Sequence, residues 1–221
     1  MKQQIKISDA VVRRLPIYLR YLNELSMKNV RTVSSQDLGN KLDLNPAQIR
    51  KDLAYFGEFG KKGIGYDVGY LIEKIRQILK LDKTINVALV GAGNLGRALC
   101  NYNAYLKDNM KIVAVFDAAP GKIGDRINNL TVQPVSELKE TVRERGISIG
   151  IITVPEGEAQ LVANQFVEAG IEAILNFAPA IIKVPPHIRV HYADFTVELQ
   201  SLAYYLNRNE NETEEAEESH R

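Results

Sequence analysis

Three glycines stand at a spacing that could hold a phosphate. They lie in the order Gly91-Ala92-Gly93-Asn94-Leu95-Gly96, between an apolar run and a stretch with a helical pattern. The apolar run, Ile85 to Val90, is rich in β-branched residues and is typical of a strand buried on both faces. The first glycine permits a tight turn, the second lets a pyrophosphate approach the backbone, and the third lets the helix pack on the strand. The helix N-terminus then offers N–H groups and a partial positive charge to the phosphates.

An acid follows at the position where such a fold binds a ribose. A second apolar run, Lys111 to Phe116, ends in Asp117, which lies 21 residues beyond Gly96. An acid at about this distance accepts a hydrogen bond from the ribose 2′-hydroxyl. A carboxylate there would repel a 2′-phosphate, so the sequence predicts a preference for NAD(H) over NADP(H). The alternative is a glycine-rich loop with no ligand, but the strand, the helix and the acid together favour dinucleotide binding.

Composition and charge narrow the classes of function. The chain has 221 residues, 45% hydrophobic and 25% charged, as in ordinary globular proteins. No apolar run approaches a membrane span, no secretory signal is recognisable, and the single cysteine, Cys100, suits a reducing cytoplasm, where we expect the protein to lie. Residues 1–80 hold 15 Lys and Arg against 8 Asp and Glu, whereas the whole chain has a net charge of only +1. The basic first third predicts a polyanionic partner.

Two short helices in the first third match a helix-turn-helix. One starts at Ser34, and the other starts at Asn45-Pro46-Ala47-Gln48, with asparagine at the N-cap and a glutamine able to reach back to it. The second helix should run to about Phe56. In this motif the second helix enters the major groove of DNA. The residues that it leaves largely outside are Gln48, Arg50, Lys51 and Tyr55.

A glycine-rich basic segment follows this helix. Four glycines between Gly57 and Tyr66 exclude a helix and predict a hairpin wing with a basic tip. Such a tip could lie on phosphate or enter a minor groove, and its residues are Lys61, Lys62 and Gly63. Further helices are expected over 8–28, where Pro16 either kinks the helix or marks its start, and over 67–81. A solvated basic surface or a protein-binding helical domain would be the alternatives to DNA binding.

Strands and helices alternate after Asp117. We expect helices over 135–145 and 156–169 and strands over 147–154 and 171–176. This order predicts an α/β fold with a doubly wound parallel sheet, in which ligands bind outside the carboxyl ends of the strands. Unless they are plain turns, two further strand ends should therefore reach the cofactor: Thr153, Val154 and Pro155, and Asn176, Phe177, Ala178 and Pro179.

The end of the chain divides into an apolar helix and an acidic tail. Asp194 should cap a helix from Phe195 to Leu206 whose apolar residues occupy more than one face, which is typical of a dimer element. Residues 208–221 hold six glutamates and are predicted to be disordered. The expected segments are a DNA-binding domain (1–81), a Rossmann NAD(H)-binding domain (82–193), a dimerisation helix (194–207) and the acidic tail (208–221).

The sequence contains no set of residues suited to catalysis. A nicotinamide dehydrogenase needs an acid–base group where hydride is transferred. Two of the three histidines, His187 and His191, lie in a proline-broken extended segment, and His220 lies in the tail. No cluster of cysteine and histidine indicates a metal. We therefore expect no catalytic residue and no metal, and this favours a sensor whose signal is the cofactor and whose output is DNA binding.

Four stretches together resemble the Rex family of bacterial redox-sensing transcriptional repressors. They are Arg50 to Gly57, the wing through Tyr66, Gly91 to Gly96, and Ile174 to Pro179, and the resemblance covers about residues 5–207 in the same order. It implies a homodimer with winged-helix N-terminal domains and Rossmann C-terminal domains, whose last helix is exchanged between subunits. It also implies that operator DNA is held when NADH is scarce and released when NADH binds, with NAD⁺ competing.

The resemblance implies roles for particular residues. Arg50 and Lys51 should lie in the major groove, and Lys61, Lys62 and Gly63 should lie at the wing tip. Arg20, Tyr102 and Asp194 match a polar switch, in which an arginine and a tyrosine compete around an aspartate of the partner subunit. Phe195 matches an aromatic residue near the partner's nicotinamide. Tyr102 is also expected to contact the cofactor. One departure is Ala118-Ala119 after Asp117, where family members often carry a further acid.

Two other functions fit parts of the pattern. A small NAD-dependent oxidoreductase, whose first domain only dimerises, would turn over a carbonyl substrate and show no salt-sensitive affinity for DNA. A DNA-bound regulator that senses another nucleotide would bind NADH weakly.

Overall fold

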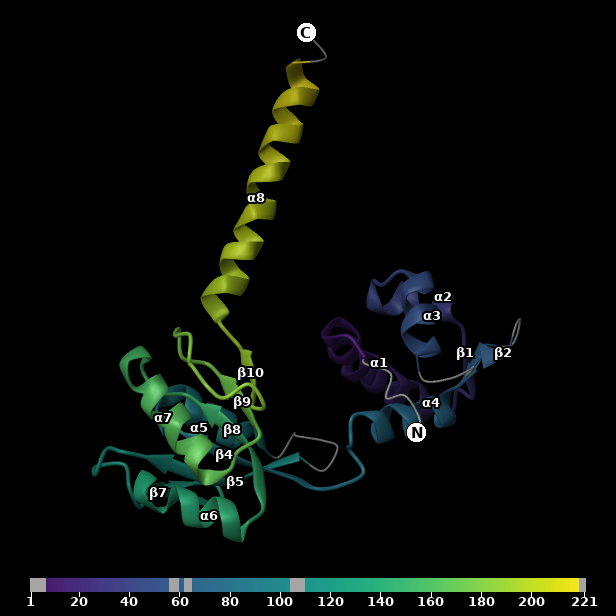
Figure 1. Ribbon diagram of the computed structural model, residues 1–221. Coiled ribbons are helices and arrows are strands. Elements are labelled where there is room, and N and C mark those ends of the chain that lie inside the picture. The colour runs from purple at the N-terminus through teal and green to yellow at the C-terminus, as the bar shows by residue number, and fades with distance from the viewer. Residues whose placement is uncertain (1–6, 56–59, 62–64, 104–109, 219–221) are drawn as a thin grey trace. The chain divides into compact units, whose positions relative to one another are not determined.

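The chain folds into two compact units, Met1–Lys83 and Thr84–Arg221 (Figure 1). The computed structural model describes residues 7–55, 60–61, 65–103 and 110–218, and it describes no side chain at 60, 61 or 207–218. Within the described ranges, no helix is both long enough and apolar enough to cross a membrane.

The first unit is a winged helix, as the sequence predicts. In the part of this unit that the structure describes, a three-stranded antiparallel sheet in the order β1-β3-β2 accompanies four helices. The elements are α1 (Asp9–Met27), β1 (Thr32–Val33), α2 (Ser35–Leu42), α3 (Pro46–Ala54), β2 (Gly60–Lys61), β3 (Gly65–Asp67) and α4 (Val68–Ile78). Of the expected wing tip, Lys62 and Gly63 lie outside the described residues, as does Phe56.

The helix starts of this unit follow the sequence signals. Ser34 and Asp37 form a reciprocal capping box at the start of α2. Ser8 caps α1, which runs unbroken through Pro16, so a start near Pro16 is wrong. Because proline has no N–H, the carbonyl of Val12 loses that intrahelical donor, and both residues lie on the exposed side of α1.

A buried carboxylate joins α3 to α1. Asp52 is fully buried; its Oδ2 accepts hydrogen bonds from Nε of Arg14 at 2.6 Å and from the hydroxyl of Tyr18 at 2.7 Å. Its Oδ1 accepts from Nη2 of Arg14 at 2.8 Å and from Nε2 of Gln48 at 2.7 Å. Burial opposes the charge, but these donors outweigh it and lower the pKa of Asp52 below its usual value. The charged carboxylate therefore fixes α3 against α1.

The second unit contains a seven-stranded sheet in the order β10-β9-β8-β4-β5-β7-β6. Neighbouring strands are parallel except β6 and β7. The strands are β4 (Ile85–Val90), β5 (Met110–Asp117), β6 (Arg126–Ile127), β7 (Leu130–Pro134), β8 (Ile147–Ile152), β9 (Ala173–Asn176) and β10 (Arg189–Tyr192). The helices are α5 (Asn94–Tyr102), α6 (Leu138–Glu144, after the 3-10 turn η2, Val135–Glu137), α7 (Glu156–Ala169) and α8 (Phe195–Glu218).

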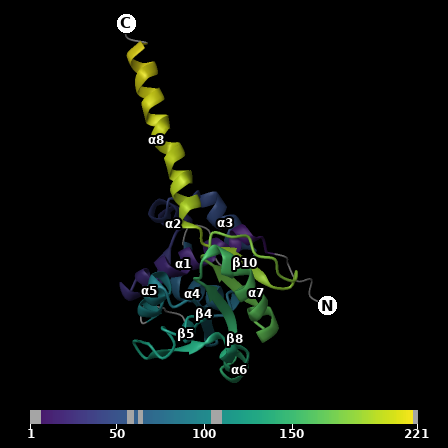
Figure 2. The same ribbon diagram turned by 90° about the vertical axis from the view of Figure 1, so that its left-hand side faces the viewer.

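Helices cover both faces of this sheet, which is the predicted doubly wound arrangement (Figure 2). Side chains alternate along β4, so Ala88 and Val90 pack with α6 and α7 in one core. Val87 and Leu89 point to the other face, where they pack with Cys100 of α5. Because the central strand is buried on both sides, the loop that follows it is held on a rigid support.

Three features differ from the sequence prediction. The strands β6 and β7 were missed because a two-residue strand and Leu130–Pro134 give a weak alternating pattern. The extended segment after Val184 contains β10, which extends the parallel sheet. The predicted disorder is wrong for residues 208–218, where α8 continues. No glycine or proline stands between Phe195 and Arg221 to end the helix, and its glutamates and alanine favour helix.

Removing the buried carboxylate should loosen the first unit. We expect Asp52→Ala to lower the free energy of unfolding by about 3 kcal/mol, because Arg14, Tyr18 and Gln48 would lose a buried partner. Urea unfolding followed by circular dichroism measures this, with exposed Asp82→Ala as the control.

The same substitution should alter the response to acid. A carboxyl whose pKa is lowered by folding stabilises the folded state above about pH 4, and that contribution is lost as the pH falls further. The acid-induced loss of stability should therefore be smaller in Asp52→Ala than in the wild type. Equal stability of the two proteins at neutral pH would contradict the assigned role.

Candidate cofactor and DNA sites

The glycine loop is fixed by close backbone contacts. Gly91 has φ +111°, a conformation that favours glycine. A Cβ on Gly96 would overlap the carbonyl oxygen of Gly91, so the start of α5 can approach the loop only without a side chain. The Oγ1 of Thr153 donates to the carbonyl of Gly91 at 2.8 Å and lies 3.1 Å from that of Val90. The end of β8 thus holds the turn that follows β4.

The middle glycine leaves the space that a pyrophosphate needs. Gly93 is the N-cap of α5, and its carbonyl accepts the first intrahelical hydrogen bond, from the N–H of Arg97 at 2.9 Å. A Cβ on Gly93 would meet no other atom within 4 Å. The first N–H groups of a helix have no partner within the helix and attract anions. An open glycine at a helix N-terminus therefore fits the phosphates of a dinucleotide.

The acid at the end of β5 is buried and heavily bonded. The Oδ1 of Asp117 accepts from the N–H of Ala119 at 2.8 Å. Its Oδ2 accepts from the N–H of Ala92 at 2.7 Å and from Nζ of Lys122 at 3.0 Å. Burial raises the pKa of this carboxyl, but the donors outweigh that effect and lower it below the usual value. Asp117 thus ties the glycine loop to the segment after β5.

A cavity of about 580 Å³ lies against these segments. It brings together two glycines of the loop, the acid and the predicted end of β8: Gly91, Gly93, Asp117, Thr153, Val154 and Pro155. The other lining residues were not predicted from the sequence, and they are Val90, Ala118, Ala119, Lys122, Val135, Glu158, Leu161, Val162 and Gln165. The helical spacing of Glu158, Leu161, Val162 and Gln165 is a signal that could have found the α7 wall.

The end of β9 does not line this cavity. Asn176 is buried, and its side chain holds its own turn: Oδ1 accepts from the N–H of Ala178 at 3.0 Å, and Nδ2 donates to the carbonyl of Ala180 at 2.8 Å. The N–H of Phe177 donates to the carbonyl of Ile152 at 3.0 Å. These bonds account for Asn176 as a turn residue, so cofactor contact by residues 176–179 stays a prediction.

The expected switch residues lie on three elements. Tyr102 is exposed at the end of α5. Phe195, which is expected near the partner's nicotinamide and not in the switch, is the first residue of α8 and is 74% exposed. Asp194 caps α8 as predicted, because its Oδ1 accepts from the N–H of Thr196 at 2.8 Å. Arg20 is exposed on α1, in the first unit. The switch itself stays a prediction.

Four residues in or next to α3 are expected to contact DNA, and two of them lie on its exposed side. Arg50 and Lys51 are exposed, and Nη1 of Arg50 donates to the hydroxyl of Ser35 at 2.8 Å. Gln48 and Tyr55 are half-buried. Asn45 caps the helix as predicted, through the N–H of Ala47. The reach of Gln48 back to that cap is wrong, because its amide donates to Asp52 instead.

Other reactive groups are accounted for within the described residues. Cys100 is buried, and burial raises the pKa of its thiol to about 11, so it stays protonated at neutral pH. No three metal-ligating side chains gather in the described ranges.

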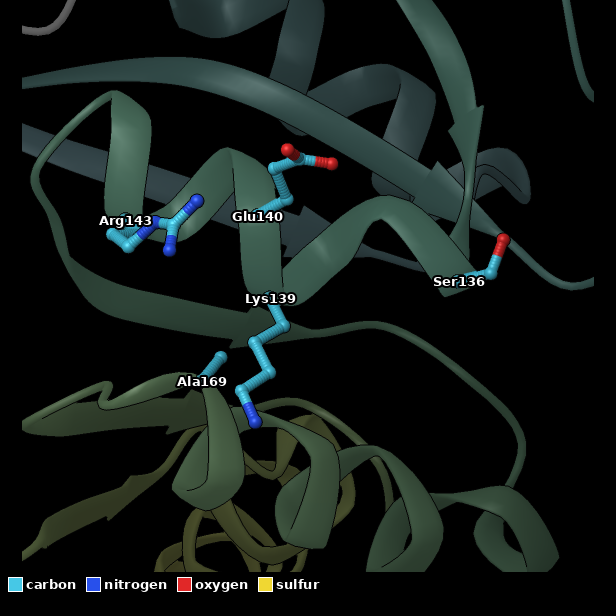
Figure 3. Close-up of a pocket in the computed structure, with 5 residues that line it drawn as sticks. All are labelled: Ser136, Lys139, Glu140, Arg143 and Ala169. Carbon is cyan, nitrogen blue, oxygen red and sulfur yellow. The ribbon is translucent and has the colours of Figure 1, made fainter.

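A second hollow, of about 360 Å³, is lined by Ser136, Lys139, Glu140, Arg143 and Ala169 (Figure 3). Four of these five residues are exposed, and Lys139 extends toward the end of α7, which is typical of an open surface groove.

Known proteins resemble the chain over nearly its whole length. Residues 6–54 match the family model "Putative DNA-binding protein N-terminus", and residues 82–180 match "CoA binding domain". A redox-sensing transcriptional repressor Rex from Brevibacillus brevis is 62% identical over 93% of this chain and 100% of its own length. The chain belongs to the Rex family. The Rex of Listeria innocua is 44% identical over 97% of this chain and 100% of its own length.

Solved structures of the same family share the fold. RSP, a Rex-family repressor, was solved with β-NAD⁺ and operator DNA, and that structure covers 96% of this chain and 97% of its own at 38% identity, with a TM-score of 0.87. RSP in complex with β-NADH matches with a TM-score of 0.84 at 37% identity, over 96% of this chain and 99% of its own.

The loop geometry predicts different costs for two glycine substitutions. Gly96→Ala should lower the free energy of unfolding by about 2 kcal/mol or more, because its Cβ overlaps the backbone of Gly91. Gly93→Ala should leave stability within about 0.5 kcal/mol of the wild type, because its Cβ enters open space. Thermal unfolding of the two variants compares them, and equal stability would contradict the assigned packing.

Proposed function

We propose that this chain is a cytoplasmic repressor that binds a palindromic DNA operator as a homodimer and releases it when NADH binds. The observation that carries the proposal is the pairing of an exposed basic helix, α3, with a dinucleotide cavity in one chain. The structures of RSP in complex with β-NAD⁺ and operator DNA and in complex with β-NADH support both halves.

The first unit would hold DNA through α3 and the wing. Arg50 and Lys51 would contact the major groove, with Gln48 and Tyr55 beside them, and Lys61, Lys62 and Gly63 would reach the flanking backbone or minor groove. A two-fold dimer needs half-sites about one helical turn, or a multiple of it, apart. We therefore assign DNA binding to residues 1–81 and cofactor binding to residues 82–193.

The last helix would join the two subunits. Its first residues expose large apolar side chains, including Phe195 at 74% and Leu206 at 71%. A single chain rarely leaves so much apolar surface in water, and a second copy would cover it. We therefore assign residues 194–207 to the dimer interface.

The second unit would hold the cofactor along its loop and cavity. The loop from Gly91 to Gly96 and the start of α5 would receive the pyrophosphate, and the adenosine would lie between the end of β5 and α7. Residues 176–179, Tyr102 and the partner's Phe195 would surround the nicotinamide. When bound, this group supplies the redox signal through the charge of its ring.

The response would depend on closure of the dimer. The subunits would close around the reduced ring, because an apolar pocket disfavours the positive charge of the oxidised ring. Closure would move the two α3 helices off adjacent grooves, with Arg20, Tyr102 and Asp194 exchanging partners. A ligand shifts such an equilibrium only by its differential affinity for the two states, so a strong response requires several kcal/mol.

The proposal is tested by measuring operator binding at fixed salt, with NADH and NAD⁺ added separately. We expect NADH to weaken binding to a palindromic operator by about tenfold or more, whereas NAD⁺ changes it little. Gly93→Ala should bind the operator as the wild type does but lose the response, because its Cβ blocks the pyrophosphate. Indifference to both forms would discard the sensor, and no DNA binding would favour the oxidoreductase.

The switch can be tested in the same assay. Asp194→Asn removes the charge but keeps an oxygen that can cap α8. We expect this variant to bind the operator and to lose most of its release by NADH. A wild-type release in this variant would contradict the switch.

A further inference from the structure

We propose that Arg97 is a positioning residue for the cofactor, because it orients the peptide between Ala92 and Gly93 so that the N–H of Gly93 can donate to the pyrophosphate. This inference rests on the proposed binding of a dinucleotide at the glycine loop. Arg97 is not one of the described residues that line the cavity, so it would act through the loop and not by touching the cofactor.

The place of Arg97 in its helix is unfavourable for a cation. Arg97 is the fourth residue of α5, which begins at Asn94. A helix N-terminus carries a partial positive charge, so a positive side chain in the first turn opposes the helix dipole. The contribution of Arg97 therefore comes from its side-chain contacts and not from the stability of the helix.

Those contacts hold one buried residue of the glycine loop. The Nε of Arg97 donates to the carbonyl of Ala92 at 3.2 Å. The N–H of Ala92 donates in turn to Oδ2 of Asp117 at 2.7 Å. Ala92 is only 1% exposed, and both polar groups of its backbone are thus bonded to side chains.

Holding the carbonyl of Ala92 also sets the direction of the next N–H. In a planar trans peptide, the C=O bond and the following N–H bond point in opposite directions. No peptide bond in the described ranges is cis. The bond from Arg97 therefore directs the N–H of Gly93 away from the guanidinium, and Gly93 lines the cavity where the pyrophosphate would lie.

An acid on a fixed turn holds Arg97 in this position. The Nη2 of Arg97 forms an ion pair with Oδ2 of Asp125. The N–H of Asp125 donates to the carbonyl of Lys122 at 3.1 Å, and its carbonyl accepts from the N–H of Val132 at 2.9 Å. Because the guanidinium is planar and rigid, a carboxylate that holds Nη2 also fixes the direction of Nε.

The ion pair itself should add little to stability. The side chains of Arg97 and Asp125 are 36% and 44% exposed, and ion pairs in contact with water contribute little to the free energy of unfolding. Cofactor affinity and stability should therefore separate when Arg97 is replaced.

Two substitutions of matched length test the role of Arg97. Arg97→Gln places an amide N–H at the position along the side chain that Nε holds, whereas Arg97→Met has no donor there. The experiment is calorimetric titration of the full chain with NADH and, separately, with NAD⁺. We expect Arg97→Met to weaken both by about fivefold or more, and by similar factors, because the pyrophosphate is common to the two forms. Arg97→Gln should recover most of the affinity.

Two further measurements separate this role from a general loss of structure. The unfolding temperature of Arg97→Met should stay within about 4 °C of that of the wild type, and its operator affinity without cofactor should be unchanged. The matched control is Arg126→Met, which removes the same charge from the exposed residue that follows Asp125 and should change neither cofactor affinity.

The outcomes distinguish this inference from the proposed function. If the wild type binds neither form of the cofactor, both are wrong. If the wild type binds and Arg97→Met binds equally well, only the inference is wrong. If Arg97→Gln is as weak as Arg97→Met, the arginine acts through its charge and not through the carbonyl of Ala92, which also overturns the inference.

Asp125→Ala provides a test in which the two explanations predict opposite signs. If charge alone mattered, removal of an acid would strengthen the binding of a phosphate. We expect weaker NADH binding, because Arg97 loses its support, and no further loss when Asp125→Ala is added to Arg97→Met. Tighter NADH binding in Asp125→Ala, or additive losses in the double variant, would overturn the inference.

Discussion

The carboxylate of Asp117 is the interaction on which the cofactor site depends. It joins the end of β5, the glycine loop through Ala92, and the following turn through Ala119 and Lys122. The loop in turn fixes the start of α5, because Gly96 packs on Gly91. The position of the helix N-terminus, and hence the place of a phosphate, therefore follows from one buried charge.

A second buried carboxylate plays a parallel part in the DNA-binding unit. Asp52 joins α3 to α1 through Arg14 and Tyr18 and also holds Gln48. The exposed residues Arg50 and Lys51 stand on the other side of that anchored helix. In both units, a rigid inner contact thus positions a polar surface for a charged ligand. Such preorganisation reduces the entropy cost of binding.

The sequence predicts most of the secondary structure but fewer of the residues that form the site. Strong signals such as the Ser34 cap, the Gly91–Gly96 loop and the Glu156–Ala169 helix predict elements that the structure confirms, because they are local. The roles of Asp52 and Lys122 could not be predicted in this way, whereas helical spacing was a local signal for the α7 wall. The role of Asp52 depends on contacts with residues that are distant in the chain. The role of Lys122 depends on which donors the carboxylate of Asp117 accepts in the folded chain. The short strands β6 and β7 were missed for a related reason, since β7 gains its place by pairing with β5.

In the proposed mechanism, cofactor and operator compete through the shape of one dimer. Thermodynamic linkage requires that each ligand change the affinity for the other by the same factor. The direct measurement is the NADH affinity of the full chain with and without saturating operator DNA. We expect the operator to weaken NADH binding by the factor by which NADH weakens operator binding, and to leave NAD⁺ binding nearly unchanged. An NADH affinity that the operator does not change would contradict it.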